Sequence, residues 1–183
     1  MEDLGLMSFI IKEKSISDIK IITRNEIGDK RGYLSRVFCS DELIAVGWNQ
    51  KISQINLTFT KDKGTVRGLH YQEPPFEEKK IVNCLEGQIF DVAVDMRPDS
   101  DTYLQWTAEI LSKDNMNALF IPEGFAHGFQ ALTENVKMLY FHSKPYAPAY
   151  EKGINVMDPK LRINWPLEVS TISDRDKEFP FLN

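Results

Sequence analysis

The feature that most constrains the fold of this chain is a series of short, strand-like segments separated by turn residues, with hardly any helical periodicity. Residues 52–60 show the pattern well, because polar and apolar side chains alternate along them and a strand points successive side chains to opposite faces. Glycine, proline and acidic residues interrupt the chain between such segments. The pattern predicts a mainly β protein, an antiparallel sandwich or jelly roll with only short helices at its periphery.

The expected strands share β-rich composition and flanking turn signals; they are residues 19–23, 32–38, 52–60, 65–72, 79–85, 88–96, 102–111, 118–121, 127–132 and 136–143. Glu86 and Gly87 are interpreted as the turn of a hairpin between the two expected strands that flank them. Residues 41–46 fit one or two helical turns, with Ser40 or Asp41 as the N-cap.

The length of 183 residues predicts one domain that spans residues 1–183 and has enough material for a sizeable core. We expect its strands to lie between about residues 19 and 143. Prolines and scattered charges in residues 145–183 indicate an irregular segment. Trp165 and Phe179 are expected to anchor this segment, so that it is packed and ordered.

The formal net charge of -5 argues against a general role in binding nucleic acid or a membrane surface, but a few local arginines can still hold an anionic small molecule. Cys39 and Cys84 are far apart and form no CxxC motif, which favours a reducing compartment. The sequence lacks a long apolar run, and acidic Glu2 and Asp3 stand where a signal peptide is basic. We therefore expect a cytoplasmic protein without a membrane span.

The most informative stretch is residues 65–72, which contains one of only three histidines. Alternation puts Gly68, His70 and Gln72 on one face of this expected strand. An imidazole can give or take a proton near neutral pH, although a lone histidine is more often one that is simply hydrogen-bonded in a core. Arg67 and Lys80 lie nearby in the sequence, and together these residues suggest a proton-transfer centre beside an anion site.

Plain alternation raises one difficulty, because it places Arg67 and His70 on opposite faces of the strand. If both side chains serve one pocket, a bulge or bend must redirect one of them. Gly68 stands between them, and glycine permits such an irregularity. We therefore expect a bulge near Gly68 if the two residues act together.

Other polar side chains share faces with apolar ones: Tyr140 with Met138 and His142, His127 with Phe129 and Ala131, Lys80 with Val82 and Cys84, and Asp91 with Ile89 and Ala93. Each also has a purely structural interpretation. Tyr140 fits a half-buried tyrosine whose hydroxyl reaches water, and Lys80 fits a solvated lysine on an edge strand. Taken singly, these structural interpretations are the more frequent ones.

The spacing Pro122-x-Gly124-x-x-His127 resembles the second half-motif of the cupin superfamily. Metal-binding cupins add a first motif with two histidines two residues apart, and here that pair is His70 and Gln72. A first-row metal usually takes about three good nitrogen or oxygen ligands, which His70, His127 and a carboxylate could still supply. Because the second imidazole is missing, a metal-free pocket is favoured.

Several ordered motifs resemble the dTDP-4-dehydrorhamnose 3,5-epimerase family, and the match runs from about residue 19 to 180. They are GDKRG at 28–32, QIN at 54–56, RGLHYQ at 67–72, GQIFDVAVD at 87–95, IPEGFAHGF at 121–129, LY at 139–140, WP at 165–166 and SDRD at 173–176. The resemblance implies a cupin-like jelly-roll barrel without metal or other cofactor. It also implies a homodimer that epimerises a nucleotide-linked 4-keto-6-deoxyhexose at C3, C5 or both.

The resemblance also implies roles for individual residues. A hydrogen next to a ketone is weakly acidic, so its removal needs a base and support for the enolate oxygen. The implied catalytic residues are His70 as the base, Asp176 as its supporting carboxylate, Tyr140 as the acid on the other face, and Lys80 as the cation at the enolate oxygen. The implied substrate-binding residues are Arg31 and Arg67 for the diphosphate, Gln54 and Asn56 for polar contacts, His127 for the sugar, and Tyr146 for the base.

The chain departs from the usual family pattern at residues 34–36 and at Asn83, and it has an additional histidine, His142. The interval between Asn56 and Arg67 is also one residue longer than is usual in the family. These departures bear on the nucleotide base and on which carbon is inverted. The alternatives are a mono-epimerase acting on a related dTDP- or CDP-linked keto sugar, a metal-dependent cupin, and a non-catalytic sugar-binding cupin. His70, Lys80, Tyr140 and Asp176 together argue against the non-catalytic alternative.

Overall fold

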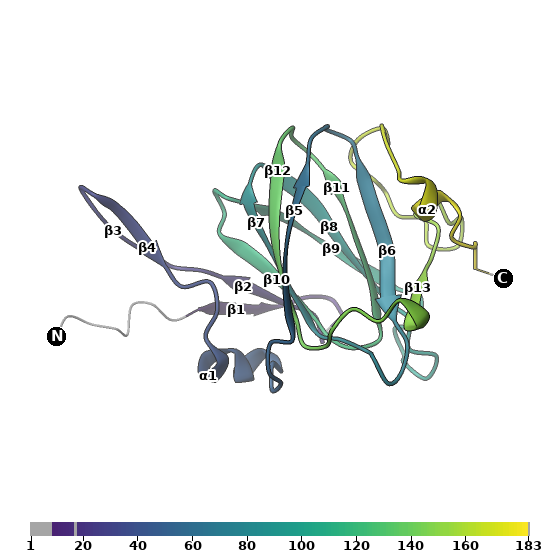
Figure 1. Ribbon diagram of the computed structural model, residues 1–183, viewed down its shortest axis with the longest axis horizontal. Coiled ribbons are helices and arrows are strands. Elements are labelled where there is room, and N and C mark those ends of the chain that lie inside the picture. The colour runs from purple at the N-terminus through teal and green to yellow at the C-terminus, as the bar shows by residue number, and fades with distance from the viewer. Residues whose placement is uncertain (1–8, 17, 183) are drawn as a thin grey trace.

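The computed structural model describes residues 9–16 and 18–182, and two antiparallel sheets face each other in it (Figure 1). The six-stranded sheet contains, in spatial order, β1 (Ile10–Glu13), β2 (Lys20–Thr23), β10 (Asn117–Ile121), β7 (Lys80–Glu86), β12 (Val136–His142) and β5 (Gln54–Thr60). The five-stranded sheet contains β13 (Glu151–Gly153), β6 (Val66–Gln72), β11 (Phe125–Ala131), β8 (Gln88–Asp95) and β9 (Trp106–Ser112). The hairpin of β3 (Glu26–Asp29) and β4 (Gly32–Ser35) extends away from both sheets.

Short helices lie at the periphery, as the sequence predicts: α1 (Ser40–Leu43), η2 (Ile44–Val46), η3 (Pro148–Tyr150) and α2 (Asp174–Lys177). The predicted N-cap of the first helix is wrong by one residue. Cys39 occupies that position with extended backbone angles and makes no side-chain cap hydrogen bond. None of the helices in the described parts of the chain has the length and apolar character that a membrane span requires.

The main core fills the space between the two sheets and confirms the predicted alternation of faces. Val82 and Cys84 on β7 and Met138 on β12 point inward from the six-stranded sheet. They meet Ile89 and Ala93, which point inward from β8. Burial of this apolar surface is the main favourable term for the fold, at about 25 cal/mol per Å² removed from water.

The mainly β, antiparallel prediction is confirmed, and every expected strand is present with bounds shifted by a few residues. The predicted hairpin at Glu86 and Gly87 is wrong. β7 pairs with β10 and β12 in one sheet, whereas β8 pairs with β11 and β9 in the other. Gly87 (φ +78°) therefore turns the chain from one sheet to the other. Periodicity identifies which residues form a strand, but it does not identify the strand's partner.

The expected bulge in β6 is present. β6 pairs His70 with His127 and Arg67 with Phe129 of β11, so one extra residue lies on β6 between the two pairs. Gly68, at φ +120°, occupies this irregularity. A side-chain Cβ there would lie 2.6 Å from Gly128 Cα, so only glycine allows the two strands to approach this closely.

The C-terminal segment packs across the outer face of the five-stranded sheet (Figure 1). The Trp165 ring lies edge-on to Phe90, with ring centroids 6.1 Å apart. The side-chain amide of Gln130 exchanges two hydrogen bonds of 3.0 Å with the backbone of Leu167. Phe179 packs edge-on against the His70 ring at 5.4 Å. These contacts hold α2 beside β6.

The close approach of β6 and β11 predicts a large effect of Gly68→Ala. The added Cβ would overlap the backbone of Gly128, so we expect the free energy of unfolding to fall by at least about 2 kcal/mol, measured by urea titration. Gly32→Ala is the matched control, because Gly32 has φ +133° but open space around its Cβ position. It should cost only about 1 kcal/mol, the strain of the left-handed backbone. Equal losses in the two variants would contradict the close-approach argument.

Candidate active site

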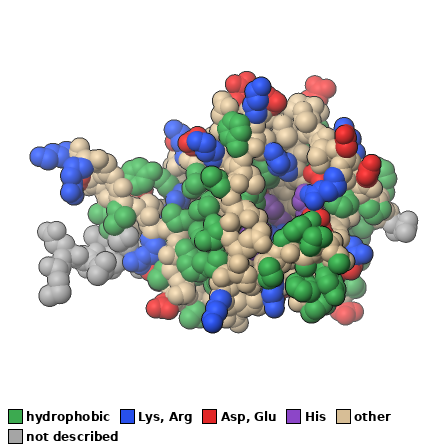
Figure 2. All heavy atoms as spheres, in the orientation of Figure 1, with side chains coloured by type: hydrophobic (Ala, Val, Ile, Leu, Met, Phe, Trp, Pro, Cys, Tyr) green, Lys and Arg blue, Asp and Glu red, His purple; other side chains and the backbone are tan. Residues whose placement is uncertain are grey.

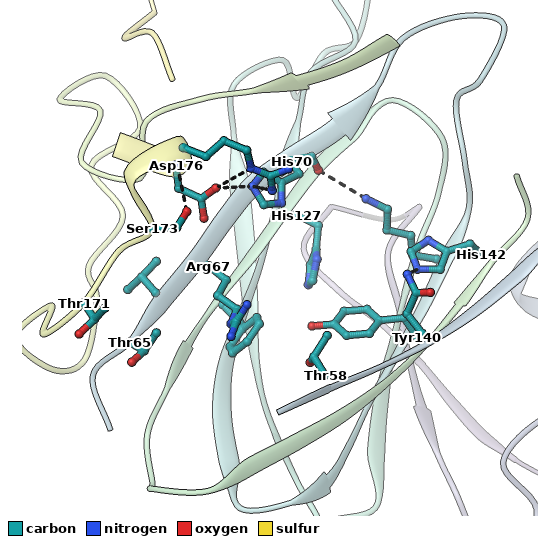
Figure 3. A pocket seen from close by; sticks show the side chains of 15 residues that line it. Thr58, Thr65, Arg67, His70, His127, Tyr140, His142, Thr171, Ser173 and Asp176 are labelled. Carbon is teal, nitrogen blue, oxygen red and sulfur yellow. Dashed lines mark hydrogen bonds and ion pairs between the residues drawn. The ribbon is translucent and has the colours of Figure 1, made fainter. Parts of the chain in front are cut away.

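A cavity of about 620 Å³ opens between the two sheets and the C-terminal segment (Figure 3). Figure 2 shows histidine side chains in a hollow on this face of the molecule. The cavity is lined by Asn56, Thr58, Thr65, Val66, Arg67, His70, Lys80, His127, Phe129, Tyr140, His142, Thr171, Ser173, Arg175 and Asp176. Its volume is in the range that encloses a drug-sized ligand.

His70 and Asp176 form a hydrogen-bonded pair between β6 and α2. His70 Nε2 lies 2.8 Å from Asp176 Oδ1, and Asp176 Oδ2 accepts the backbone N–H of Gly68 at 3.1 Å. Burial acts to raise the pKa of Asp176, but the bonds from His70 and Gly68 outweigh it and hold the pKa below its usual value. The ionised carboxylate therefore accepts a hydrogen bond from Nε2–H of His70, and Nδ1 is the ring nitrogen that is free to act as a base.

The start of α2 fixes the position of this carboxylate. Ser173 is the N-cap, and its hydroxyl oxygen accepts the backbone N–H of Asp176 at 3.1 Å. Arg175 lies on the outer side of the pair, with one guanidinium nitrogen 3.2 Å from His70 Nε2 and an ion pair to Glu151. The cap stabilises the first turn of the short helix, and the ion pair joins the helix to β13, the neighbour of β6.

A second histidine–carboxylate pair lies deeper in the cavity. His127 Nε2 is 2.7 Å from Oδ1 of Asp91, which is completely buried on β8. Burial raises the pKa of Asp91, and the contact with His127 offsets only part of that shift. Oδ2 of Asp91 has no hydrogen-bond partner among the described residues. Asp91 thus fixes the ring of His127, which lines the cavity.

Tyr140 enters the cavity from the six-stranded sheet, opposite the His70 wall (Figure 3). Its hydroxyl donates to Met138 Sδ at 3.3 Å, and its ring lies edge-on to His127 and stacked on His142. Burial, helped by the negative charge of Asp91, raises the pKa of the Tyr140 phenol well above its usual value. The phenol therefore keeps its proton over the neutral pH range and can act as a donor.

Lys80 is buried beside Glu78, a residue that is not among the predicted site residues. Lys80 Nζ lies 3.1 Å from Glu78 Oε1 and 3.5 Å from the His70 carbonyl oxygen. His142 Nδ1 contacts the other oxygen of Glu78 at 2.9 Å. Burial acts to raise the pKa of Glu78, but Lys80 and then His142 lower it below its usual value. The carboxylate is therefore ionised and supports the ammonium charge of Lys80.

Arg67 places a positive charge at the mouth of the cavity. Its guanidinium donates to Thr60 Oγ1 at 3.1 Å and to the Phe59 carbonyl at 3.3 Å, and both acceptors are uncharged. No carboxylate of the described residues forms an ion pair with it. The bulge at Gly68 turns Arg67 and His70 to the same cavity, which resolves the conflict with plain alternation. The charge is available to an anionic group.

Three predicted binding residues lie outside the cavity lining. Gln54 and Tyr146 meet at the rim, where Gln54 Oε1 accepts the backbone N–H of Tyr146 at 3.0 Å. The Tyr146 hydroxyl donates to Glu151. Arg31 lies on the extended hairpin of β3 and β4, where its side chain is 85% exposed and pairs with Asp29. Within a single chain Arg31 does not reach the cavity.

The cavity residues do not form a metal centre of the cupin type. Each of His70 and His127 directs Nε2 at its own carboxylate. The amide of Gln72, which stands at the position of the second cupin histidine, bonds to the carbonyls of Phe76 and Pro145. In the described part of the chain, no three His, Cys, Asp or Glu side chains gather closely enough to hold a metal ion.

Comparison with known proteins decides the family. The dTDP-4-dehydrorhamnose 3,5-epimerase family model matches residues 13–183. A curated dTDP-4-dehydrorhamnose 3,5-epimerase of Methanothermobacter thermautotrophicus is 40% identical over 171 residues, which cover 91% of this chain and 91% of the relative. The chain belongs to the dTDP-4-dehydrorhamnose 3,5-epimerase family. The protein is thus an epimerase, an enzyme of the isomerase class, as the resemblance implies.

Two solved structures of this epimerase family are similar over nearly the whole chain. The Bacillus anthracis enzyme, with TDP and PPi bound, has a TM-score of 0.92 and 34% identity, over 96% of this chain and 100% of its own. A dTDP-6-deoxy-D-glucose-3,5-epimerase from Legionella pneumophila, in complex with dTDP-4-keto-L-rhamnose, has a TM-score of 0.87 and 37% identity, over 92% and 89%. The cupin-like jelly-roll fold predicted for the chain is confirmed.

The structure brings together most of the site residues that the family motifs select, and it adds others. His70, Lys80, Tyr140 and Asp176 all line one cavity, together with Asn56, Arg67 and His127. Glu78, Asp91 and Arg175 are not among the site residues predicted from the sequence. The sequence did contain a signal that Asp91 has a specific partner. It is a carboxylate on the inward face of an apolar strand, where a charge needs a partner. Glu78 precedes its strand, so no periodicity indicated where its side chain points.

The buried pair predicts a strong effect of Asp176→Asn on epimerase activity. The amide supplies one acceptor oxygen where the carboxylate supplies two, so His70 or Gly68 loses its partner. We expect activity to fall by about 10²–10⁴-fold, as for other imidazoles that lose their supporting carboxylate. Hydrogen exchange of the sugar ring in D2O, followed by proton NMR, measures this loss.

Asp174→Asn is the matched control, because Asp174 lies in the same helical turn but its side chain is 96% exposed and forms only a surface ion pair with Lys177. It should leave the exchange rate within about two-fold of the parent protein. Thermal unfolding of both variants verifies that α2 stays folded. Near-normal exchange in a folded Asp176→Asn variant would contradict the role of the pair.

Proposed function

We propose that the protein converts dTDP-4-dehydro-6-deoxy-D-glucose to dTDP-4-dehydro-L-rhamnose by inverting C5 and C3. The observation that carries this proposal is that His70 and Tyr140 line one cavity from opposite sheets, which supports assigning them as base and acid. The base is His70, paired with Asp176, and the acid is Tyr140, whose phenol keeps its proton. The dTDP-sugar in the complex of the Legionella relative supports the nucleotide and the sugar class.

The chemistry needs only proton transfers. His70 Nδ1 takes the proton from the carbon beside the C4 ketone, and the electron pair of the broken C–H bond moves onto O4 to give an enolate. The ammonium of Lys80, held by Glu78, stabilises this negative charge where it develops. Tyr140 then donates its proton to the opposite face of the carbon, and the ketone re-forms with the centre inverted. Solvent exchange restores both groups for the second carbon.

Binding of the substrate is assigned to the mouth of the same cavity. A diphosphate carries about two negative charges, and the overall charge of the chain repels it, so local cations must hold it. We assign this role to Arg67, whose charge is not neutralised by a carboxylate, with Asn56 as a polar contact. His127, fixed by Asp91, lines the sugar end. Tyr146 is half exposed at the rim, where it could stack on the base.

A homodimer would bring Arg31 to a cavity. Edge strand β5 exposes Ile55, Leu57 and Phe59 on the face opposite the cavity, and each is more than half exposed. Figure 2 shows hydrophobic side chains gathered in this region. The hairpin of β3 and β4 also carries exposed apolar side chains and extends beyond the sheets. We propose that the hairpin of each protomer lies on the other protomer and brings its Arg31 to the partner cavity.

We also propose that residues 1–183 act as a single domain in the cytoplasm. The C-terminal segment supplies Asp176 to His70, so it completes the site of the preceding sheets. Cys39 and Cys84 are free thiols, which suits a reducing compartment. Burial raises the pKa of the Cys84 thiol to about 12, so this thiol is inert, not a nucleophile.

Proton NMR in D2O with dTDP-4-keto-6-deoxyglucose tests the proposed reaction. Deuterium at both C3 and C5, with conversion to the L-rhamno sugar, is the expected result. His70→Asn should lower exchange at both carbons by at least about 10²-fold. Tyr140→Phe keeps the ring, so exchange by His70 should persist while the yield of inverted sugar falls.

Deuterium at one carbon only would show a mono-epimerase, and no uptake by the unaltered protein would contradict the proposal. A CDP-linked keto sugar, run in parallel, tests the choice of nucleotide. Equal epimer yields from the Tyr140→Phe variant and the parent protein would show that another group is the acid.

Mixed dimers test whether Arg31 acts on the partner cavity. Arg31→Ala and His70→Asn are each expected to be weak or inactive alone. After the two variants are unfolded and refolded together, one cavity of each mixed dimer has an intact His70 and an intact Arg31 from the other protomer. Activity should therefore rise well above that of either variant alone. No rise, with mixed dimers shown by mass spectrometry of tagged chains, would contradict the proposed arrangement.

A further inference from the structure

A chain of hydrogen bonds runs from the rim of the cavity to Lys80, and its direction is set at the rim. The backbone N–H of Tyr146 can only donate, and it lies 3.0 Å from Gln54 Oε1. The amide of Gln54 is therefore oriented with its nitrogen toward Asn56, and Gln54 Nε2 donates to Asn56 Oδ1 at 3.0 Å. This contact orients the Asn56 amide in turn. The orientation of both amides follows from one fixed donor.

The same direction continues through His142. Asn56 Nδ2 now faces His142 Nε2 at 3.4 Å, and because Nδ2 is a donor, Nε2 must accept. The imidazole proton then lies on Nδ1, which donates to Glu78 Oε2 at 2.9 Å. The other oxygen of Glu78 accepts from Lys80 Nζ at 3.1 Å. Every donor in the chain meets an acceptor. Reversing one link alone would place two donors face to face beside it, and reversing the whole chain would place two donors face to face at Tyr146.

We propose that His142 is a positioning residue for Lys80, acting through Glu78, with its tautomer set by Asn56. This role rests on the proposed function, in which Lys80 supports the enolate. The side chains of Lys80, Glu78 and His142 are all largely buried, so the carboxylate cannot exchange its partners for water at low cost. With His142 in place, Glu78 has one oxygen committed to the ring and one to the ammonium.

This role also explains why two predicted substrate contacts do not line the cavity. Gln54 bonds to Asn56 and, held by the backbone N–H of Tyr146, determines its orientation, while both residues stay outside the cavity lining. The ring of His142 stacks on Tyr140, with ring centroids 6.0 Å apart and an interplanar angle of 21° (Figure 3). The histidine that departs from the family pattern is therefore joined to the Lys80 side of the cavity. It does not replace Tyr140 as the acid, because its proton points away to Glu78.

The tautomer can be measured without any substrate. The chain has three histidines, and long-range proton–nitrogen NMR of 15N-histidine-labelled protein separates Nδ1–H from Nε2–H rings. His70 and His127 face their carboxylates with Nε2, whereas His142 faces Glu78 with Nδ1. We expect two Nε2–H rings and one Nδ1–H ring, and His142→Phe should remove the Nδ1–H signals alone. An Nε2–H tautomer at His142 would overturn the proposal.

Kinetics of two variants test the positioning role itself. His142→Phe keeps a ring beside Tyr140 but removes the bond to Glu78, and kcat should fall by roughly ten-fold with KM changed by less than about two-fold. His142→Asn can return an N–H near the position of Nδ1, so it should recover most of the lost kcat. A role in packing alone would favour the Phe variant over the Asn variant, and that order would overturn the proposal.

The two experiments separate this inference from the proposed function. If the unaltered protein does not epimerise the keto sugar, the proposed function fails while the NMR result still decides the direction of the hydrogen-bond chain. If the protein is active and His142→Phe keeps full kcat, the proposed function stands and the positioning role is wrong. The unchanged signals of His70 and His127 in the Phe variant verify that the rest of the cavity is intact.

Discussion

The structure depends on the hydrogen bond from the backbone N–H of Gly68 to Asp176. The bulge in β6 withdraws this N–H from the strand ladder, and a buried donor without an acceptor would cost about 1–3 kcal/mol. Asp176 supplies the acceptor, and its second oxygen fixes His70. One irregularity in a strand thus determines where the C-terminal segment docks, which nitrogen of His70 is free, and how Arg67 comes to share the same cavity.

The charges of the cavity are arranged as neighbouring pairs in a chain that is acidic overall. Asp176 lines the cavity, and Asp91 and Glu78 lie behind its lining residues. Each of the three buried carboxylates faces a histidine or lysine, so none is directed unpaired at an anionic ligand. Such pairs are oriented before a substrate enters, and no large reorganisation is needed when charge develops on the enolate oxygen. Among the described residues, Arg67 has no carboxylate partner and leaves a positive charge at the entrance.

Local pattern in the sequence predicted much of this arrangement. It did not predict which distant strands pair with one another. Alternation placed Tyr140 with Met138 and His142, and the conflict at Arg67 and His70 located the bulge. The prediction of a hairpin between β7 and β8 was wrong because strand composition does not specify which sheet a strand joins. Glu78 lies in a loop without periodicity, so its orientation could not be predicted. The residues that support Lys80 come from or lie beside β5, β7 and β12, and only the pairing of these strands places them together.

Strand β5 has two functions on its two faces. Asn56 and Thr58 line the cavity, while Ile55, Leu57 and Phe59 alternate with them and face outward. In the proposed dimer, the same strand would belong to both the substrate site and the subunit contact. A dissociated protomer would then lose support behind the strand that orients His142, so that specific activity would depend on protein concentration. It would also expose an apolar sheet edge, so substitutions that weaken the subunit contact would favour aggregation as well as inactivation.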